Sequence, residues 1–224
     1  GFIMAISKLN FNSLNVTPAA NEAIGFDSGA DDLETGSGGG SMVFIKKLTA
    51  SSSGTLTFHN GTDSVVLDST YKEYVFKFIN IHPETDGAEL EFQANAAGAS
   101  GFNETITSTS FEANHKEDDG ETGLSYIASG DQAQGTAFQG IQRNVYNTND
   151  NGASGTLQIF NPSSTTFVKH FMSTMQSQQL DSVGMSINYF HGGYFNLTAA
   201  IDEFQFKFSS GNMDSGDICL YGIL

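Results

Sequence analysis

The segment IDEFQFKF at residues 201–208 is the clearest indication of the fold class of this chain. Phenylalanine stands at every second position, at Phe204, Phe206 and Phe208, and polar or charged residues stand between them. A period of two residues is that of an extended strand, whose successive side chains point to opposite faces of a sheet. The segment therefore predicts a β-strand with one face in an aromatic core and the other face in water.

The same alternation recurs along most of the chain. It is clearest at residues 71–81, where Tyr74, Phe76 and Phe78 share one face, and Pro83 ends this strand because proline lacks the N–H of a ladder bond. A stretch at residues 136–146 reads as a strand with a bulge or as a short helix. The other predicted strands are residues 42–48, 55–58, 65–67, 88–93, 104–111, 124–127, 156–160, 165–176, 185–190 and 218–223.

Turn residues separate these strands at short intervals. Asn60-Gly61 and Asn161-Pro162 are turn pairs, and His191-Gly192-Gly193 also reads as a turn. The small or acidic stretches at residues 94–101 and 112–123 read as loops. Many short strands without a fixed repeat predict an all-β fold, an antiparallel two-sheet jelly-roll sandwich, because two closed sheets protect their edges best.

The first 41 residues differ from the rest. They scatter apolar residues among polar ones and end in the glycine-rich run 36–41, which reads as a hinge. We therefore expect an extended N-terminal arm with its hinge at 1–41 and the sandwich at 42–224. The arm either docks on a neighbouring molecule or folds back on its own domain. Its apolar run at residues 2–6 is too short to span a membrane, so no membrane insertion is expected.

Composition excludes some classes of function. The chain of 224 residues has 19 Phe, enough for a large core, and a net charge of −16, which repels nucleic acid. No basic stripe is present to reverse that expectation. Cys219 is the only cysteine, so no intrachain disulfide can form, and its alternating neighbours predict a buried thiol.

No catalytic motif stands out. None of the five histidines lies in a hydrolase or metalloprotease motif. Two carboxylate pairs, Glu89 with Glu91 and Asp202 with Glu203, are of the kind that glycosidases use. However, Glu89 and Glu91 fall on the polar face of a predicted strand, where carboxylates simply meet water. We therefore expect a non-enzymatic protein with no cofactor.

Two further sites remain open as alternatives. Calcium prefers hard oxygen ligands, which two acidic clusters offer, although neither has EF-hand spacing and solvated turns are the simpler reading. These clusters are Asn212, Asp214 and Asp217, and Asp118, Asp119 and Glu121. The second alternative is a surface-recognition loop for sugars around Gly192-Gly193, although burial of its aromatic residues in the core is the simpler reading. Its residues are Tyr189, His191, Tyr194 and Asn196.

Segments along nearly the whole chain carry a family resemblance. They include MAISKLNFNSLNVTP at residues 4–18 and IFNPSSTT at residues 159–166, and the others are residues 44–53, 78–83, 208–212 and 220–223. In these segments the chain resembles a family of virion structural, tail-fibre-like proteins of marine tailed bacteriophages such as cyanophages. The resemblance is weakest at residues 94–121.

The resemblance implies a structural role and no catalytic residues. We therefore expect a tail- or fibre-associated module of the phage particle that assembles through its arm and presents loops to the host, whose surface glycans are candidate ligands. A homo-oligomer is expected, with a trimer suggested by how fibres assemble, together with contacts to other virion proteins. A capsid decoration protein and a carbohydrate-binding module are the alternatives.

Overall fold

Strand β14 (Ile201–Phe208) has the bounds and the facing that its alternation predicts in the computed structural model of the chain. Phe204 and Phe206 are fully buried and Phe208 is 3% exposed, whereas the side chains between them are only partly covered. The structure describes residues 23–26, 33–36, 41–180 and 183–224. Their strands form a nine-stranded sheet, a four-stranded sheet and a two-stranded hairpin.

The two larger sheets differ in size. The nine-stranded sheet has, in spatial order, β3 (Met42–Thr49), β15 (Met213–Ile223), β5 (Glu73–Pro83), β11 (Ala153–Phe160), β12 (Lys169–Leu180), β13 (Gly184–Phe195), β7 (Ile106–Lys116) and β8 (Thr122–Tyr126), and β9 (Ala133–Gly135) also pairs with β7. The four-stranded sheet has β10 (Gln139–Val145), β6 (Ala88–Ala96), β14 and β4 (Leu56–His59). The hairpin is β1 (Ala23–Phe26) with β2 (Leu33–Gly36).

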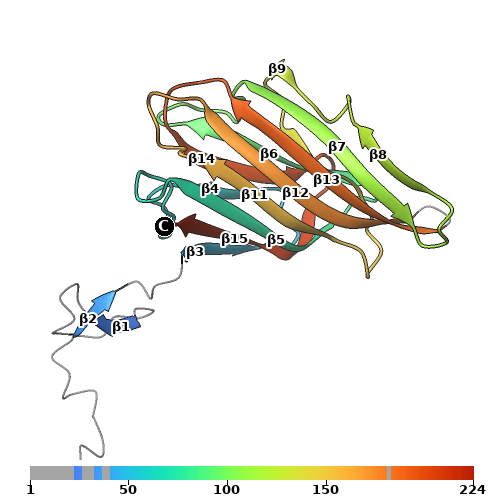
Figure 1. Cartoon of the computed structure of the whole chain (residues 1–224), viewed down its shortest axis with the longest axis horizontal. Helices are drawn as coiled ribbons and strands as arrows, with labels where there is room; N and C mark the ends of the chain where they lie inside the picture. The colour runs from blue at the N-terminus through green and yellow to red at the C-terminus, as the bar shows by residue number, and fades with distance from the viewer. Residues whose placement is uncertain (1–22, 27–32, 37–40, 181–182) are drawn as a thin grey trace, which may run out of the picture. The chain divides into compact units, whose positions relative to one another are not determined.

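Strand pairing is antiparallel in both sheets. Figure 1 shows the long strands of the nine-stranded sheet lying side by side, with β7 and β8 at one end and β15 and β3 at the other. The pairing of β12 with β13 and of β13 with β7 runs without a register shift. Every second side chain of these three strands therefore lies on the same face of the sheet. The fold is an all-β sandwich, as the alternation predicted.

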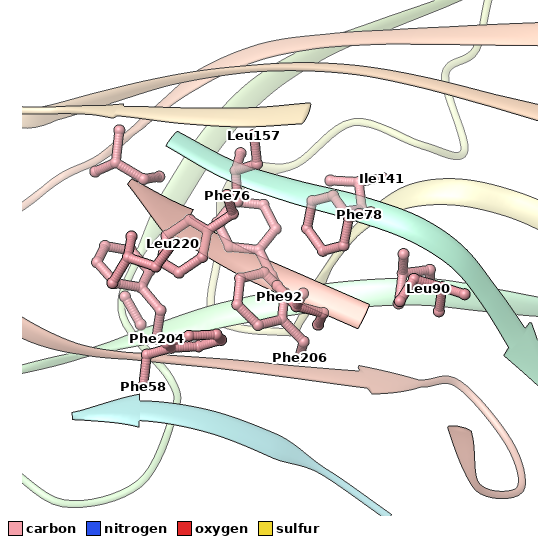
Figure 2. Close-up of a cluster of buried hydrophobic side chains, with 14 of the residues drawn as sticks. Phe58, Phe76, Phe78, Leu90, Phe92, Ile141, Leu157, Phe204, Phe206 and Leu220 are labelled. Carbon is pink, nitrogen blue, oxygen red and sulfur yellow. The ribbon is translucent and has the colours of Figure 1, made fainter. Parts of the chain in front are cut away.

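Phenylalanine joins the two sheets. The ring of Phe206 on β14 meets that of Phe76 on β5 edge to face, with centroids 5.0 Å apart. Phe92 on β6 meets Phe171 on β12 in the same way at 5.2 Å. Figure 2 shows the rings of Phe76, Phe92 and Phe206 packed together in this core. Burial of each such ring contributes about 1.5–3 kcal/mol, and each ring pair about 0.5–1.5 kcal/mol more.

Several local expectations need correction. Residues 112–116 continue β7 instead of opening a loop, and residues 65–67 form no strand although Val65 and Leu67 are buried. The glycine pair 192–193 is not a turn, because β13 runs through it. A Cβ on Gly193 would lie 2.6 Å from Cζ of Phe171, so the glycine makes room for a core ring. The open choice at residues 136–146 resolves as a bulged strand, β10.

The chain divides into two units, Gly1–Val43 and Phe44–Leu224. In the first unit the structure describes residues 41–43, where β3 begins, and the β1–β2 hairpin, in which Ala23 pairs with Gly36 and Phe26 with Leu33. The sequence did not predict this hairpin. Most of the predicted arm and residues 37–40 of its glycine-rich run lie outside the described residues.

Candidate functional site

The predicted recognition residues lie on both faces of strand β13 or just beyond it. Tyr189 and His191 point between the sheets and are 2% and 3% exposed. Tyr194 lies on the opposite face, where its ring contacts that of His170. Asn196 follows the strand, and its Nδ2 donates to Oε1 of Gln134 at 2.7 Å. Because β13 does not turn at its glycine pair, the structure does not bring these four side chains together on one surface.

The inward-facing residues belong to a buried polar layer. Nε2 of His191 lies 3.0 Å from Oγ of Ser110. Burial, and secondarily the charge of Arg143, lowers the pKa of His191 to about 4. Burial, followed by a hydrogen bond to Glu112, raises the pKa of Tyr189. A serine beside an imidazole is the arrangement of a hydrolase nucleophile, but Ser110 is fully buried and a substrate would not reach it.

The opposite face of the nine-stranded sheet, here called the outer face, carries exposed aromatic side chains. The register places Tyr126 of β8 opposite Phe111 of β7, and Phe111 opposite Phe190 of β13. The rings of Phe111 and Phe190 stack with centroids 4.8 Å apart and planes 11° apart. Tyr126 is 59% exposed and Phe111 is 42% exposed. We call this row of three the aromatic ladder.

A polar groove of about 540 Å³ opens on the same sheet. Amide, hydroxyl and imidazole groups line it, among them Gln176, Gln178 and Ser186. Nε2 of Gln176 donates to Oγ of Ser186 at 2.9 Å, and Nδ2 of Asn188 donates to Oε1 of Gln176 at 3.3 Å. These bonds hold the amides in fixed orientations. The remaining lining residues are His115, Lys116, Glu117, Gly152, Ser154 and Ser177.

The groove and the aromatic ladder meet along β13. Ser186, Asn188 and Phe190 are successive outer-face residues of that strand, so Asn188 lies between the groove and the ladder. Oriented amides offer both donors and acceptors to hydroxyl groups, and aromatic rings offer an apolar surface to C–H groups. A saccharide presents both kinds of group. We call the groove and the ladder together the outer-face site.

Sequence reasoning missed the outer-face site, although the sequence holds a signal for it. Phe111 follows Thr107 and Thr109 on the polar side of its strand, and Phe190 follows Ser186 and Asn188 in the same way. An aromatic residue at a polar position marks an exposed ring. What the sequence lacked was the register that places these two rings side by side.

The predicted pair Glu89 and Glu91 lines a second hollow, of about 200 Å³, on the four-stranded sheet. Oε2 of Glu91 lies 3.2 Å from Nζ of Lys207, and Oε1 of Glu89 lies 3.9 Å from Nε of Arg143. Burial raises the pKa of Glu89, and the charge of Arg143 opposes that rise. Each glutamate therefore has a cationic partner, which is the geometry of structural ion pairs.

In the second predicted carboxylate pair, Asp202 and Glu203, the glutamate also has structural partners. Oε1 of Glu203 lies 3.7 Å from Nδ1 of His59, and Oε2 of Glu203 accepts from Nδ2 of Asn95 at 3.1 Å. The backbone carbonyl of Asp202 accepts from the amide of Asn60.

The first calcium candidate is tied to neighbouring residues. Oδ2 of Asp217 lies 3.1 Å from Nζ of Lys47, and its carboxylate also accepts from Thr49 at 2.5 Å. Asn212 donates its backbone N–H to Glu84. Among the described residues, no group of three or more His, Cys, Asp or Glu side chains is placed to hold a metal ion.

The second calcium candidate has partners of the same kind. Asp119 pairs with His115 at 3.0 Å, Glu121 pairs with Lys116 at 3.0 Å, and Asp118 accepts from the amide of Gly120. These contacts are typical of solvated turn residues.

Two remaining expectations concern the thiol and the membrane. Cys219 is free and buried, as its alternating neighbours predicted, and burial raises its pKa. In the described residues there is no helix with the length and apolar character needed to cross a bilayer.

Three comparisons with known proteins found no relative of this chain. No protein-family model matches the chain, and neither curated proteins nor solved structures include one that is significantly similar to it. The resemblance to phage virion proteins therefore stays a prediction.

Proposed function

We propose that this protein is a non-enzymatic structural component of a tailed-bacteriophage particle, associated with the tail or its fibres, and that its outer face contacts the host surface. The observation that carries the proposal is the outer-face site, a groove lined by oriented amides that continues into exposed, stacked aromatic rings. A monomeric soluble protein has no packing reason to leave such rings in water. A binding surface gives them a function.

The fold suits this role. The interlocked phenylalanines give a rigid body, and the net charge of −16 keeps a crowded assembly soluble. The finer expectation of a jelly roll belongs to the same proposal. In its support, strands β3 to β7 alternate between the two sheets, as do β13, β14 and β15. Alternation of this kind is frequent in folds built from Greek keys.

Assembly through the N-terminal arm is a further part of the proposal. Residues 1–41 dock on other virion proteins, the sandwich projects its outer face, and several copies act together as a homo-oligomer in the particle. Multiple copies raise avidity for a repetitive host surface without any new contact. Weak binding by each copy is then sufficient.

The ligand that suits the outer-face site best is a host-surface glycan, bound without a catalytic step. The same observation favours a second candidate, a carbohydrate-binding module outside any particle. A capsid decoration protein is the third candidate, and it differs from the first only in where the arm binds.

Two experiments separate these functions. Antibody labelling of intact particles in electron microscopy is expected to place the protein at the tail, whereas labelling over the capsid selects the decoration protein and no labelling removes both virion roles. A binding assay with polysaccharide from host cells, run with and without a chelator, tests the ligand. Absence of binding at millimolar sugar sets the glycan aside, and binding that the chelator abolishes shows that calcium is required.

A further inference from the structure

The edge strand of a sheet has unpaired backbone N–H and C=O groups that can form hydrogen bonds with another strand. Natural proteins block edges with short strands, with lysines or with bulges. Three of the edge strands of the two sheets carry such devices: β3 has Lys46 and Lys47, β4 has four residues, and β10 shifts register twice against β6. β9 beside β7 is only three residues long.

Among the described edges of the two larger sheets, β8 is short but carries no lysine, no proline and no bulge. Its five residues, TGLSY at Thr122–Tyr126, include no charge and no proline, and all five are exposed. It pairs with β7 over its whole length without a register shift. A regular, uncharged edge of this kind is ready to pair with another strand.

Hydrogen bonds on either side of β8 show which way its backbone groups point. The N–H of Ile127 donates to the carbonyl of Ser110 at 2.9 Å, and the carbonyl of Glu121 accepts from Lys116 at 2.9 Å. Residues of a strand direct their N–H and C=O groups alternately to its two sides. The odd-numbered residues from 121 to 127 therefore face β7.

The even-numbered residues face the free side. Thr122, Leu124 and Tyr126 thus form a row of backbone donors and acceptors along the edge of the sheet. The side chains of Leu124 and Tyr126 lie on the outer face, 74% and 59% exposed, beside Phe111. The open edge and the apolar side chains coincide on the same strand.

We propose that β8 pairs with β8 of a second copy of this chain, antiparallel and centred on Leu124. Thr122 of each copy then lies opposite Tyr126 of the other, and each of the three even-numbered residues exchanges both of its backbone hydrogen bonds with the residue opposite. Leu124 meets Leu124 of the second copy on the outer face. The two aromatic ladders join into one surface across the two-fold axis.

A second copy fits this edge better than a different partner. An antiparallel pairing of a strand with itself is self-complementary about a two-fold axis, so one surface serves both copies. A head-to-tail ring would need a second open edge, and β3 at the other end of the same sheet carries two lysines. The inference does not depend on a role in a phage particle.

The oligomeric state of the full-length protein tests the proposal. Sedimentation velocity over a range of concentrations is expected to show a monomer–dimer equilibrium. Added salt strengthens the dimer, because each copy carries a net charge of −16. Leu124→Lys places like charges opposite one another and raises the dimer dissociation constant by about tenfold or more. Hydrogen exchange of the Leu124 amide slows as concentration rises.

A matched control places the same charge elsewhere on the outer face. Met172 on β12 is 57% exposed and far from the edge in strand order, so Met172→Lys dimerises like the unchanged protein. Far-ultraviolet circular dichroism verifies that both variants are folded. A trimer, a monomer at high micromolar concentration, or a Leu124→Lys variant that still dimerises normally would each overturn the proposal.

Discussion

Nε2 of His191 lies 3.0 Å from Oγ of Ser110, and both side chains are buried between the sheets. The imidazole is neutral there because burial lowers its pKa from 6.5 to about 4. The unfolded chain binds a proton near pH 6.5, whereas the folded chain does so only near pH 4. Between these values the unfolded state holds more protons, so the free energy of unfolding falls as the pH falls.

The first prediction is that part of the free energy of unfolding is lost in acid and that this loss depends on His191. The depressed pKa corresponds to about 3 kcal/mol of stability that is present above pH 6.5 and lost by pH 4. His191→Asn removes this contribution, so the free energy of unfolding varies less with pH. Urea unfolding at several pH values measures the change. The control is His170→Asn, at an exposed position of β12. If the two variants show the same slope, the buried imidazole is not responsible.

The second prediction concerns Phe206, whose ring contacts four other phenylalanines of the core, Phe58, Phe76, Phe78 and Phe92. Phe206→Ala leaves a cavity and lowers the free energy of unfolding by about 3–5 kcal/mol. Phe167→Ala, at a residue 67% exposed, changes it by about 0.5 kcal/mol or less. Denaturant titration measures both. Equal effects would contradict the aromatic core.

The third prediction concerns Lys169, a buried ammonium held by backbone carbonyls. Its Nζ donates to Phe167 and Thr198 at 2.9 Å and to Leu197 at 3.4 Å. Lys169→Met leaves these carbonyls without their donor and lowers the free energy of unfolding by about 2–3 kcal/mol. Lys72→Met, at an exposed lysine, is the matched control and has little effect. A stable Lys169→Met protein would show that the carbonyls find other donors.

The fourth prediction compares two adjacent glycines of β13. A Cβ on Gly193 would lie 2.6 Å from Phe171 and 2.7 Å from the carbonyl of Thr107, whereas a Cβ on Gly192 meets only Thr109 at 3.9 Å. Gly193→Ala lowers the free energy of unfolding by about 1–3 kcal/mol through overpacking. Gly192→Ala is neutral or raises it by about 0.4–1 kcal/mol, because alanine restricts the unfolded chain. The reverse order in a thermal melt would contradict the placement of β13.

The fifth prediction tests the outer-face site. Phe190→Ala removes the ring between Asn188 and Phe111 and is expected to weaken binding of host-cell polysaccharide by about tenfold. Calorimetric titration measures the affinity. Phe44→Ala, at an exposed aromatic on the opposite end of the sheet, retains binding. Unchanged affinity in Phe190→Ala would remove the outer-face site from the proposed function.

Much of the fold was predictable from side-chain alternation. Strand β14 has the predicted bounds, and the inward facing of Phe76 and Phe78 on β5 was also predicted. Prediction failed where one residue type is compatible with two kinds of local structure. Glycine is common in turns, but Gly193 lies inside a strand beneath Phe171. Phe171 is distant from residue 193 in the sequence, so the local sequence does not distinguish a turn from a strand at this glycine pair.

The candidate site was less predictable than the fold. Tyr189 and His191 were candidates for a surface loop because a turn was expected after Phe190, and the continuing strand buries them, in agreement with the simpler reading that placed these aromatics in the core. Phe111 and Phe190 are 79 residues apart in the chain, and only the pairing of β7 with β13 makes them neighbours.

The all-β class and the buried face of most strands follow from the amino-acid sequence without further information, because a period of two is a local property of consecutive residues. Three features are visible only in the folded chain: which strands are neighbours, the unequal size of the two sheets and the open edge at β8. These features depend on pairing between segments that are distant in the chain. Backbone hydrogen bonds are the same for every residue type, so the choice among pairings rests on how all the side chains of both faces pack together.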